Sequence, residues 1–377
     1  MGSSGRRIPF VYSDRLTGYD MGPQHPLKPV RLRMTFELLS EYGVFEHEAA
    51  VIVEPEPAAE EDVLQAHRPD YVDAVRPLGN DKTVPDARRY GFGPGDNPLF
   101  PGIFEASLLY TGASVTAARE VADGADIAFN ISGGLHHALR DRASGFCIFN
   151  DPAIAVHSLL HKFKRIAYID IDAHHGDGVQ YAFHDRNDVL TISIHESGQS
   201  LFPGTGFAED IGLGDGIGYS VNLPVAPFTG DEIWLRVFEE IVPPLVESYG
   251  PEVIVAQLGA DGHFDDPLTH LNLTTAAWLE AVKTILGFGS PVVALGGGGY
   301  NLSSVTRMWT LAYATMLGVE LSDQIPDRYA QQYGIRRLRD AISPVISASQ
   351  QRYARDAADE TIRTIRRLVF PIHGICP

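Results

Sequence analysis

Aspartate, histidine and tyrosine residues gather at four points of the sequence, each directly after a short apolar run. These points are the segments 133–137 (GGLHH), 170–177 (DIDAHHGD), 259–261 (GAD) and 296–300 (GGGGY). Carboxylates and imidazoles are ligands for divalent cations, and imidazole is also the side chain that exchanges protons near neutral pH. One such segment would be ordinary, but four together predict a metal-dependent catalytic site.

The candidate metal ligands are Asp172, His174 and Asp261. Asp172 and His174 are two residues apart, so on an extended segment their side chains project to the same side. Asp261 follows a different apolar run and offers a third ligand. Three N/O ligands that leave a fourth position open to water are typical of a catalytic zinc site, whereas structural zinc sites are closed.

The candidate proton-transfer residues are the adjacent histidines His136 and His137. A metal-activated water needs a group that takes its proton and passes it to a leaving nitrogen, and imidazole suits both steps. Asp170 and Asp177 are the spare acids that could orient these imidazoles. Tyr300 follows four glycines that lack the pattern of a phosphate-binding loop. A tyrosine hydroxyl placed there could stabilise the oxyanion that forms when water attacks a carbonyl.

These segments need strands that end side by side, and the sequence alternates strand-like and helix-like runs. The expected strands are residues 10–13, 50–54, 127–131, 166–171, 189–195, 219–223, 253–258 and 292–295. Amphipathic helices are expected between them, among others at residues 30–42, 106–123, 231–248 and 274–288. Continuous apolar strands that alternate with helices indicate a parallel sheet covered on both faces. Ligands of such sheets bind at the carboxyl ends of the strands, where the four polar segments lie.

Composition limits the class of protein. The 377 residues carry a formal net charge of −18, which argues against direct nucleic-acid binding. The two cysteines, Cys147 and Cys376, cannot build a disulfide framework, and no apolar run is long enough to span a membrane. We therefore expect a cytoplasmic protein that binds neither nucleic acid nor membrane.

No linker divides the chain, so we expect one domain over residues 8–377. Residues 322–377 would form a C-terminal helical extension packed on it, with a helix at 353–369. Between residues 327 and 377 there are nine arginines and five acidic residues, so this tail carries about +4 and the remainder about −22. A solvated helix face explains those arginines more simply than a partner-binding patch.

Taken together, the motifs resemble the histone deacetylase superfamily, zinc amidohydrolases that share the arginase/deacetylase fold. The resemblance covers residues 10–321 and is closest to the bacterial acetoin-utilisation branch. Besides the four segments above, the resemblance rests on the motifs at residues 25–31 (HPLKPVR), 91–97 (GFGPGDN), 143–147 (ASGFC), 150–151 (ND) and 202–206 (FPGTG). It implies a three-layer α/β/α fold with a central, mostly parallel sheet of about eight strands.

The resemblance also implies roles for individual residues in the hydrolysis of N-acyl-lysine. One zinc ion per chain, or ferrous iron, would sit on Asp172, His174 and Asp261. His137 would be the general base and acid and His136 its electrostatic partner, and Tyr300 would polarise the acyl carbonyl. The two orienting acids would be Asp170 for His136 and Asp177 for His137. A structural potassium ion would lie near Asp170, Asp172, His174 and Ser193.

Further residues are implied along the path of substrate and product. Phe146 and Phe202 would wall a narrow acyl-lysine tunnel, and Asp96 at its rim would bind the substrate backbone. Gly298 is also implied in substrate binding, and Arg31 matches a position near the channel that releases acetate. Leu268, an apolar residue at the expected tunnel mouth, favours lysine side chains or longer acyl groups.

Three alternatives remain open. A deacetylase of polyamines or other small acylated amines would want an acid at the tunnel mouth, where Leu268 stands. A binuclear manganese ureohydrolase would need a second aspartate two residues after Asp261, where the chain has His263. A metal-binding or acyl-binding sensor without catalysis would not need the set His136, His137 and Tyr300. Oligomer formation by identical chains is compatible with each of these alternatives.

Overall fold

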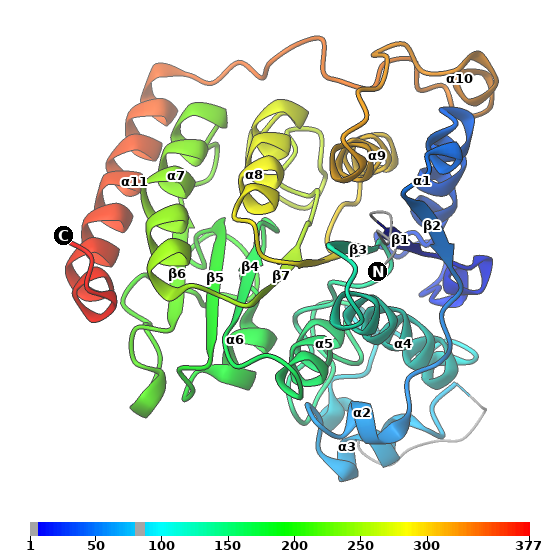
Figure 1. Ribbon diagram of the computed structural model, residues 1–377, viewed down its shortest axis with the longest axis horizontal. Coiled ribbons are helices and arrows are strands. Elements are labelled where there is room, and N and C mark those ends of the chain that lie inside the picture. Colours follow the sequence, from blue (N-terminus) through cyan, green and yellow to red (C-terminus); the bar gives the residue numbers. More distant parts are fainter. Residues whose placement is uncertain (1–6, 80–86) are drawn as a thin grey trace, which may run out of the picture.

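The computed structural model describes residues 7–79 and 87–377 and contains every strand that the sequence predicts (Figure 1). The strands are β1 Ile8–Val11, β2 Ala50–Val53, β3 Ile127–Asn130, β4 Ile166–Asp170, β5 Val189–Glu196, β6 Ser220–Val225, β7 Val253–Gln257 and β8 Val292–Leu295. The largest error concerns β1, which begins and ends two residues earlier than predicted. Ser13 lies outside it because its side chain accepts a hydrogen bond from the Arg15 N–H and starts a 3-10 turn.

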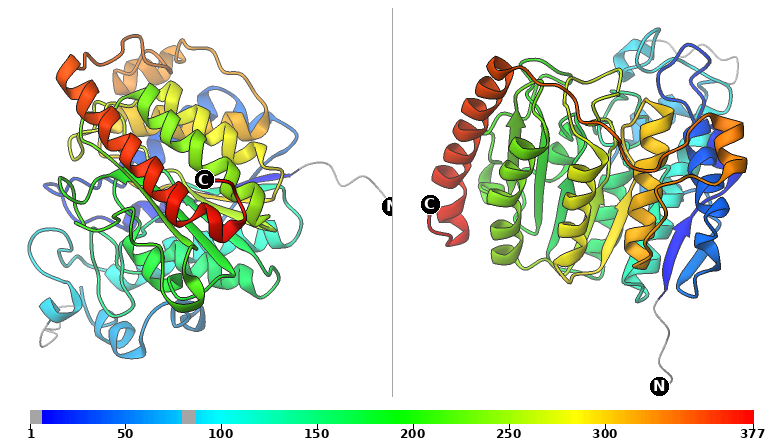
Figure 2. Two further views of the ribbon diagram at one scale, coloured as in Figure 1. Left: turned by 90° about the vertical axis from the view of Figure 1, so that its left-hand side faces the viewer. Right: turned by 90° about the horizontal axis from the view of Figure 1, so that it is seen from above.

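All neighbouring strands pair in parallel, in the order β2-β1-β3-β8-β7-β4-β5-β6. The four strands that precede the polar segments, β3, β8, β7 and β4, are therefore consecutive in the sheet. Because all strands run the same way, they end on one side of the molecule, opposite the start of β1 in the right-hand panel of Figure 2. The expectation that four strand ends meet is confirmed by this strand order.

Helices cover both faces of the sheet, which explains the apolar strands. Seven of the eight strands consist almost entirely of buried residues, and only the edge strand β2 is partly exposed. On one side lie α1 Val30–Glu41, α9 Leu302–Leu317, α8 Thr275–Gly287 and α7 Asp231–Tyr249. On the other side lie α4 Ile103–Ala122, α5 Asp151–Leu160 and α6 Asp177–Phe183 (Figure 1). The predicted three-layer α/β/α class is confirmed.

The predicted helices are present, and the structure adds others. Two short helices, α2 Glu60–Val63 and α3 Pro69–Val75, lie below α5 in Figure 1. Helices α5, α6 and α9 each begin directly after a segment that carries site residues. Asn150 and Asn301 cap α5 and α9 with their side-chain oxygens, which accept backbone N–H groups of the first turn.

The C-terminal segment contains α10 Asp327–Tyr333 and α11 Ala348–Leu368. Helix α11 starts with a capping box between Ser347 and Gln350 and packs against α7 and β6. The Thr361 hydroxyl donates to the Pro224 carbonyl at 2.7 Å, and Arg366 pairs with Glu240 of α7 at 2.9 Å. Treating this segment as an extension of one domain remains our interpretation.

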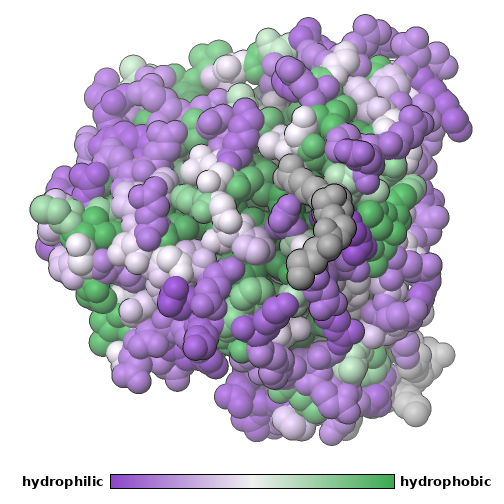
Figure 3. All heavy atoms as spheres, in the orientation of Figure 1, coloured by the Kyte–Doolittle hydropathy of each residue, from purple (hydrophilic) through white to green (hydrophobic). Residues whose placement is uncertain are grey.

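The surface on the side where the strands begin is mostly hydrophilic, with scattered hydrophobic areas (Figure 3). Among residues 7–79 and 87–377, no helix combines the length and the apolar composition that a bilayer crossing requires. The large apolar side chains instead fill the two layers between sheet and helices, where Trp234, Trp278 and Trp309 are fully buried.

Candidate active site

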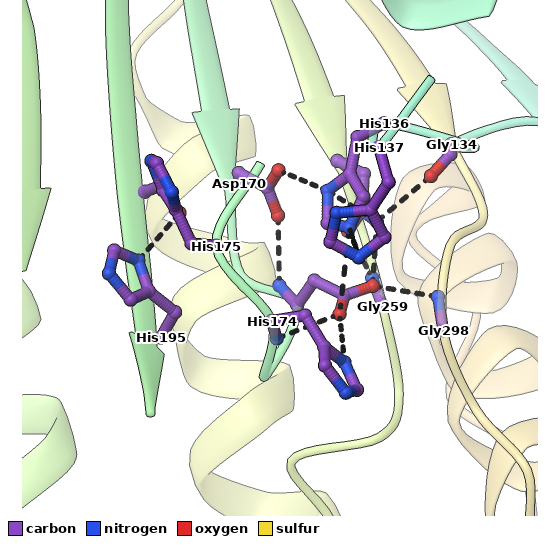
Figure 4. Close-up of polar contacts among 12 residues, drawn as sticks. Gly134, His136, His137, Asp170, His174, His175, His195, Gly259 and Gly298 are labelled. Carbon is purple, nitrogen blue, oxygen red and sulfur yellow. Dashed lines mark hydrogen bonds and ion pairs between the residues drawn. The ribbon is translucent and has the colours of Figure 1, made fainter. Parts of the chain in front are cut away.

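The polar segments after β3, β4, β7 and β8 converge on one buried cluster (Figure 4). Asp170 is the last residue of β4, and Asp172 and His174 follow it directly. The segment after β3 brings His136 and His137 to the same place, and the segment after β8 brings Gly298. Asp261, four residues after β7, also joins the cluster.

Asp172, His174 and Asp261 form a compact group of possible metal ligands, each of them buried. One ligand atom from each residue lies within 4.8 Å of the other two. His174 Nδ1 is 2.8 Å from Asp261 Oδ2 and 3.2 Å from Asp172 Oδ1. Within the described part of the chain, no other group of three such side chains meets this condition.

Buried hydrogen-bond donors hold the carboxylates in place. Asp172 Oδ2 accepts from the Gly298 N–H and from Gln257 Nε2, both at 2.7 Å. Asp261 Oδ1 accepts from the Ala173 N–H at 2.8 Å. A Cβ atom on Gly298 would lie 2.1 Å from Asp261 Oδ2, so only glycine lets the backbone approach this closely. The structure therefore places Gly298 against the candidate metal ligands.

Electrostatics support a cation at this point. Among the described residues, neither Asp172 nor Asp261 forms a salt bridge with a lysine or arginine. Burial and the nearby Asp172 carboxylate raise the pKa of Asp261 to about 7. Burial alone would lower the pKa of His174, but its hydrogen bonds to Asp172 and Asp261 raise it to about 10. Two buried carboxylates that face one imidazole are a donor set that a divalent cation would neutralise.

The two adjacent histidines each have an aspartate partner. His136 Nδ1 lies 2.7 Å from Asp170 Oδ2, and His137 Nδ1 lies 2.7 Å from Asp177 Oδ1. The Nε2 atoms of the two histidines are 3.1 Å apart. His136 therefore contacts Asp170, and His137 contacts Asp177, the acids that the sequence predicts as their partners.

The environments of the two histidines push their pKa values apart. Burial would lower the pKa of His136, but the charges of Asp170 and Asp172 outweigh it and raise the value to about 9. Burial and the charge of His136 lower the pKa of His137 to about 4. We therefore assign the proton to His136 and a neutral imidazole to His137, with Nδ1–H donated to Asp177.

Two buried residues, Gln257 and Asp151, position the histidine pair and Asp172. The sequence alone assigns neither of them a role. Gln257, at the end of β7, donates from Nε2 to Asp172 and to the Gly134 carbonyl, the latter at 3.1 Å. Asp151, the first residue of α5, accepts the N–H groups of Gly134 and Leu135 at 2.9 Å each. Both therefore hold the glycine-rich segment that carries the histidine pair. Asp151 lies within the quoted motif 150–151, but the only sequence signal for Gln257 is a polar residue that ends an apolar strand.

Tyr300 borders the cluster from the segment after β8. Its N–H donates to Asp266 Oδ2 at 2.8 Å, and its ring centroid is 6.4 Å from that of His174. Burial raises the pKa of Tyr300, so the hydroxyl keeps its proton. That hydroxyl has no hydrogen-bond partner among the described residues, which leaves it available to a substrate.

Aromatic rings line the approach to the cluster. The Phe202 ring packs edge-on against His137 with centroids 5.0 Å apart, and the Phe146 ring packs against Tyr300 at 5.7 Å. His25, to which the sequence assigned no separate role, supports this wall from outside. Its ring lies 4.5 Å from Phe146, and its Nε2 donates to the Asp96 carbonyl at 3.2 Å.

A surface cavity of about 490 Å³ lies beside this approach, and we call it the mouth cavity. Its charged lining residues are Arg88, Asp96 and Arg142, and Phe202 is shared with the wall above. The Asp96 side chain is exposed. Leu268 is half-buried, and its N–H donates to Asp266 Oδ1 at 3.0 Å, but it does not line this cavity.

Two further predicted residues lie deeper in the protein. Arg31 is buried, donates to the Gly299 carbonyl at 2.9 Å and lies over the Trp309 ring at 4.9 Å. It also lines a small internal cavity. Ser193 is the register partner of Asp170 on the adjacent strand β5, and its hydroxyl lies 2.8 Å from His195 Nδ1.

His263, which stands where a binuclear manganese site would need an aspartate, is already engaged elsewhere. Its Nδ1 accepts the Asp265 N–H at 3.1 Å, and its Nε2 lies 3.1 Å from Asp340 in the C-terminal segment. With both ring nitrogens engaged, His263 offers no ligand to a second ion. This contact counts against the ureohydrolase alternative.

Fold and cluster together define a class: a metal-dependent hydrolase whose site lies at the carboxyl ends of a parallel sheet. The family model of the histone deacetylase domain matches residues 25–316. The chain therefore belongs to the histone deacetylase family and is a hydrolase of that family. The chemistry of that family implies a catalytic metal, and Asp172, His174 and Asp261 are the described residues that could hold it.

Individual relatives agree with this assignment. Acetoin utilization protein AcuC of Bacillus subtilis is 40% identical over 329 residues, which cover 85% of this chain and 84% of that protein. Histone deacetylase B of Dictyostelium discoideum is 39% identical, with 88% of this chain and 79% of that protein covered. The crystal structure of an HDAC homolog from Aquifex aeolicus has a TM-score of 0.86 and 31% identity, with 95% of this chain and all of that chain covered. The structure of an HDAC homolog complexed with SAHA gives a TM-score of 0.87 at 31% identity, with the same coverage.

Proposed function

We propose that this deacetylase hydrolyses the amide bond of N-acetyl-lysine in peptides or proteins, with Zn²⁺ on Asp172, His174 and Asp261. The observation that carries the proposal is the histidine pair, which lies beside the metal-ligand group with each Nδ1 2.7 Å from an aspartate. Relatives named histone deacetylases and an HDAC homolog complexed with SAHA support the choice of substrate. Ferrous iron could occupy the same ligands.

When bound, the metal would supply Lewis-acid chemistry, lowering the pKa of water and polarising the amide carbonyl. His137, neutral and held by Asp177, is the base that takes the proton of the attacking water at Nε2. The same imidazole returns a proton to the departing lysine nitrogen. His136, kept charged by Asp170, stabilises the negative charge that develops beside it.

The Tyr300 hydroxyl donates a hydrogen bond to the oxygen of the former carbonyl as it becomes an oxyanion. Asp266 keeps Tyr300 in place through the backbone N–H. Phe146 and Phe202 exclude water from the lysine methylenes, and the exposed Asp96 carboxylate accepts the substrate backbone N–H. Gly298, which would border the bound acyl group, lets the backbone approach the Asp172 and Asp261 carboxylates closely.

Charges at the mouth favour an acyl-lysine peptide over an acetylpolyamine. A polyamine carries distal ammonium groups, which need acids around the tunnel entrance. Among the described residues that line the mouth cavity, Arg88 and Arg142 face a single acid, Asp96. We therefore rank polyamines and other small cationic amines second.

Several related assignments are also proposals. The acetate product would leave past Arg31, a buried arginine that lines the small internal cavity. A potassium ion would bind near Asp170, Asp172, His174 and Ser193. A cytoplasmic location, an absence of direct nucleic-acid binding and self-association remain expectations from the sequence.

A substrate panel tests the proposal. The protein is reconstituted with Zn²⁺ or Fe²⁺ and incubated with an acetyl-lysine peptide, longer acyl-lysine peptides and acetylspermidine. We expect the acetyl-lysine peptide to have a higher kcat/KM than acetylspermidine. Preference for acetylspermidine would replace the proposed substrate, and no release from any acyl amine would refute the proposed function.

A further inference from the structure

We propose that the mouth cavity is a subsite for a carboxylate on the substrate, placed next to the acyl-lysine. Its recognition groups are the guanidinium groups of Arg88 and Arg142. This inference rests on the proposed function, because it concerns how an acyl-lysine substrate is chosen rather than how it is cleaved. The favoured substrates are acyl-lysines with an acidic neighbour or with a free α-carboxylate.

The first observation is that both guanidinium groups are available. Arg88 and Arg142 are exposed, and neither has a salt-bridge or hydrogen-bond partner for its side chain among residues 7–79 and 87–377. By contrast, Arg68 and Arg186, which line a cleft on another part of the surface, are each bound to a nearby aspartate through two hydrogen bonds. Two arginines that lack a partner in the described part of the chain are notable at a net charge of −18.

The second observation is that the segments carrying the two arginines are joined. The Ala143 N–H donates to the Tyr90 carbonyl at 2.9 Å. Gly91 lies so close to Ala143 that a Cβ atom would be 2.0 Å from its carbonyl oxygen, and its φ of +83° also requires glycine. Arg88 and Arg142 are therefore presented on one connected surface rather than on two independent loops.

The third observation is position. Phe202 lines the mouth cavity and also packs on His137, so the cavity opens beside the route to the catalytic histidine. Asp96, which would bind the substrate backbone, lines the same cavity. A residue adds about 3.3 Å to an extended peptide, so a side chain one or two positions from the acyl-lysine can reach this cavity.

The fourth observation is chemical. A guanidinium group binds a carboxylate through a planar pair of hydrogen bonds, which gives geometric selectivity as well as attraction. Because the groups are exposed, salt screens the attraction, and the preference is modest. The contribution falls on substrate binding and therefore on KM rather than on kcat.

The test compares matched substrates with the metal-loaded, full-length protein. One series of acetyl-lysine peptides carries aspartate or asparagine at each of the two positions on either side of the acetyl-lysine. A second pair compares Nε-acetyl-lysine that has a free α-carboxylate with its α-amide. We expect kcat/KM to be roughly 3- to 10-fold higher for the acid at one position or more, with the difference in KM. The comparison of Nε-acetyl-lysine with its α-amide shows whether an α-carboxylate can bind the mouth cavity in place of an acidic side chain.

Variants locate the effect. Arg142→Gln is expected to abolish the preference, Arg88→Gln to reduce it, and Arg142→Glu to shift it toward peptides with lysine. Arg140→Gln is the matched control, because Arg140 is also exposed and lacks a side-chain partner among the described residues but lines the other cleft. Arg140→Gln should keep the preference for acidic substrates. In the unaltered protein, added salt should reduce this preference, so the salt dependence can be measured without a variant.

Equal kcat/KM for acidic and neutral peptides in the unaltered protein would overturn the subsite while leaving the deacetylase proposal intact. Equal loss of the preference in Arg140→Gln and Arg142→Gln would also overturn the subsite. Such a result would indicate a general electrostatic attraction by surface arginines rather than binding in the mouth cavity. Absence of turnover with every acyl-lysine would instead refute the proposed function.

Discussion

The metal-ligand cluster and the mouth cavity differ in how their charged groups are held. In the cluster, Asp172, His174 and Asp261 are buried and contact one another or backbone N–H groups at the ends of central strands. In the mouth cavity, Arg88 lies on a short 3-10 helix and Arg142 on a turn, and both are exposed and bind no other described side chain. Buried groups that are fixed by a sheet suit chemistry, whereas exposed groups on loops suit the choice among substrates.

The comparison predicts that effects of substitution decrease from the cluster toward the rim. The largest effect is expected for Asp261→Asn, which removes a negative ligand from the buried group. We expect metal content to fall well below one ion per chain and kcat/KM to drop roughly 1,000-fold or more. Metal analysis of the purified protein and peptide turnover measure the two quantities.

Asp265→Asn is the matched control for this substitution, because Asp265 is an exposed acid four residues away. It should keep both metal and activity. If Asp261→Asn kept a full metal complement and normal turnover, the assignment of the ligand group would be wrong.

An intermediate effect is expected for Gln257→Met, which keeps the volume of the side chain but removes its hydrogen bonds to Asp172 and Gly134. Partners that orient metal ligands commonly contribute 10- to 100-fold, so we expect a decrease of about that size in metal affinity or kcat. KM should change little, because Gln257 is fully buried and does not line the mouth cavity. Gln65→Met, on an exposed part of the surface, serves as the control, and unchanged kinetics in Gln257→Met would remove its positioning role.

The smallest effect is expected for Leu268→Ala, at the residue that we propose for the tunnel mouth. Leu268 is half-buried, and its backbone N–H rather than its side chain is bound by Asp266. We expect kcat to stay the same and KM for acetyl-lysine peptides to rise about threefold, with a different ranking of longer acyl groups. Steady-state kinetics with the acyl panel measure this, and a large fall in kcat would mean that the rim takes part in catalysis.

The elements could be predicted from sequence because their causes are local. Strands such as β4 and β7 are buried on both faces and therefore read as continuous apolar runs. The aspartates and histidines at their ends stand out because such groups are costly to bury without a partner. The strand order, which brings β7 and β8 between β3 and β4, depends on long-range packing and has no local signal.

The supporting contacts could not be predicted for the same reason. Gln257 reaches Gly134 and Asp172, and His263 reaches Asp340, across many intervening residues. The sequence shows that His263 stands where a binuclear manganese site would need an aspartate. It does not show that Asp340 contacts the His263 ring. Likewise, no sequence motif marks Arg88 and Arg142 as binding residues. Only the fold places them around one cavity.

We propose that Tyr300 and the histidine pair act on an acyl-lysine held beside one metal ion. The most direct measurement is turnover of an acetyl-lysine peptide by Tyr300→Phe, alongside the unaltered protein at equal metal content. We predict one metal ion per chain in both proteins and a kcat about 100-fold lower, or lower still, in the variant, because the oxyanion loses a hydrogen-bond donor. Near-normal turnover by Tyr300→Phe with its metal in place would show that the Tyr300 hydroxyl does not stabilise the oxyanion.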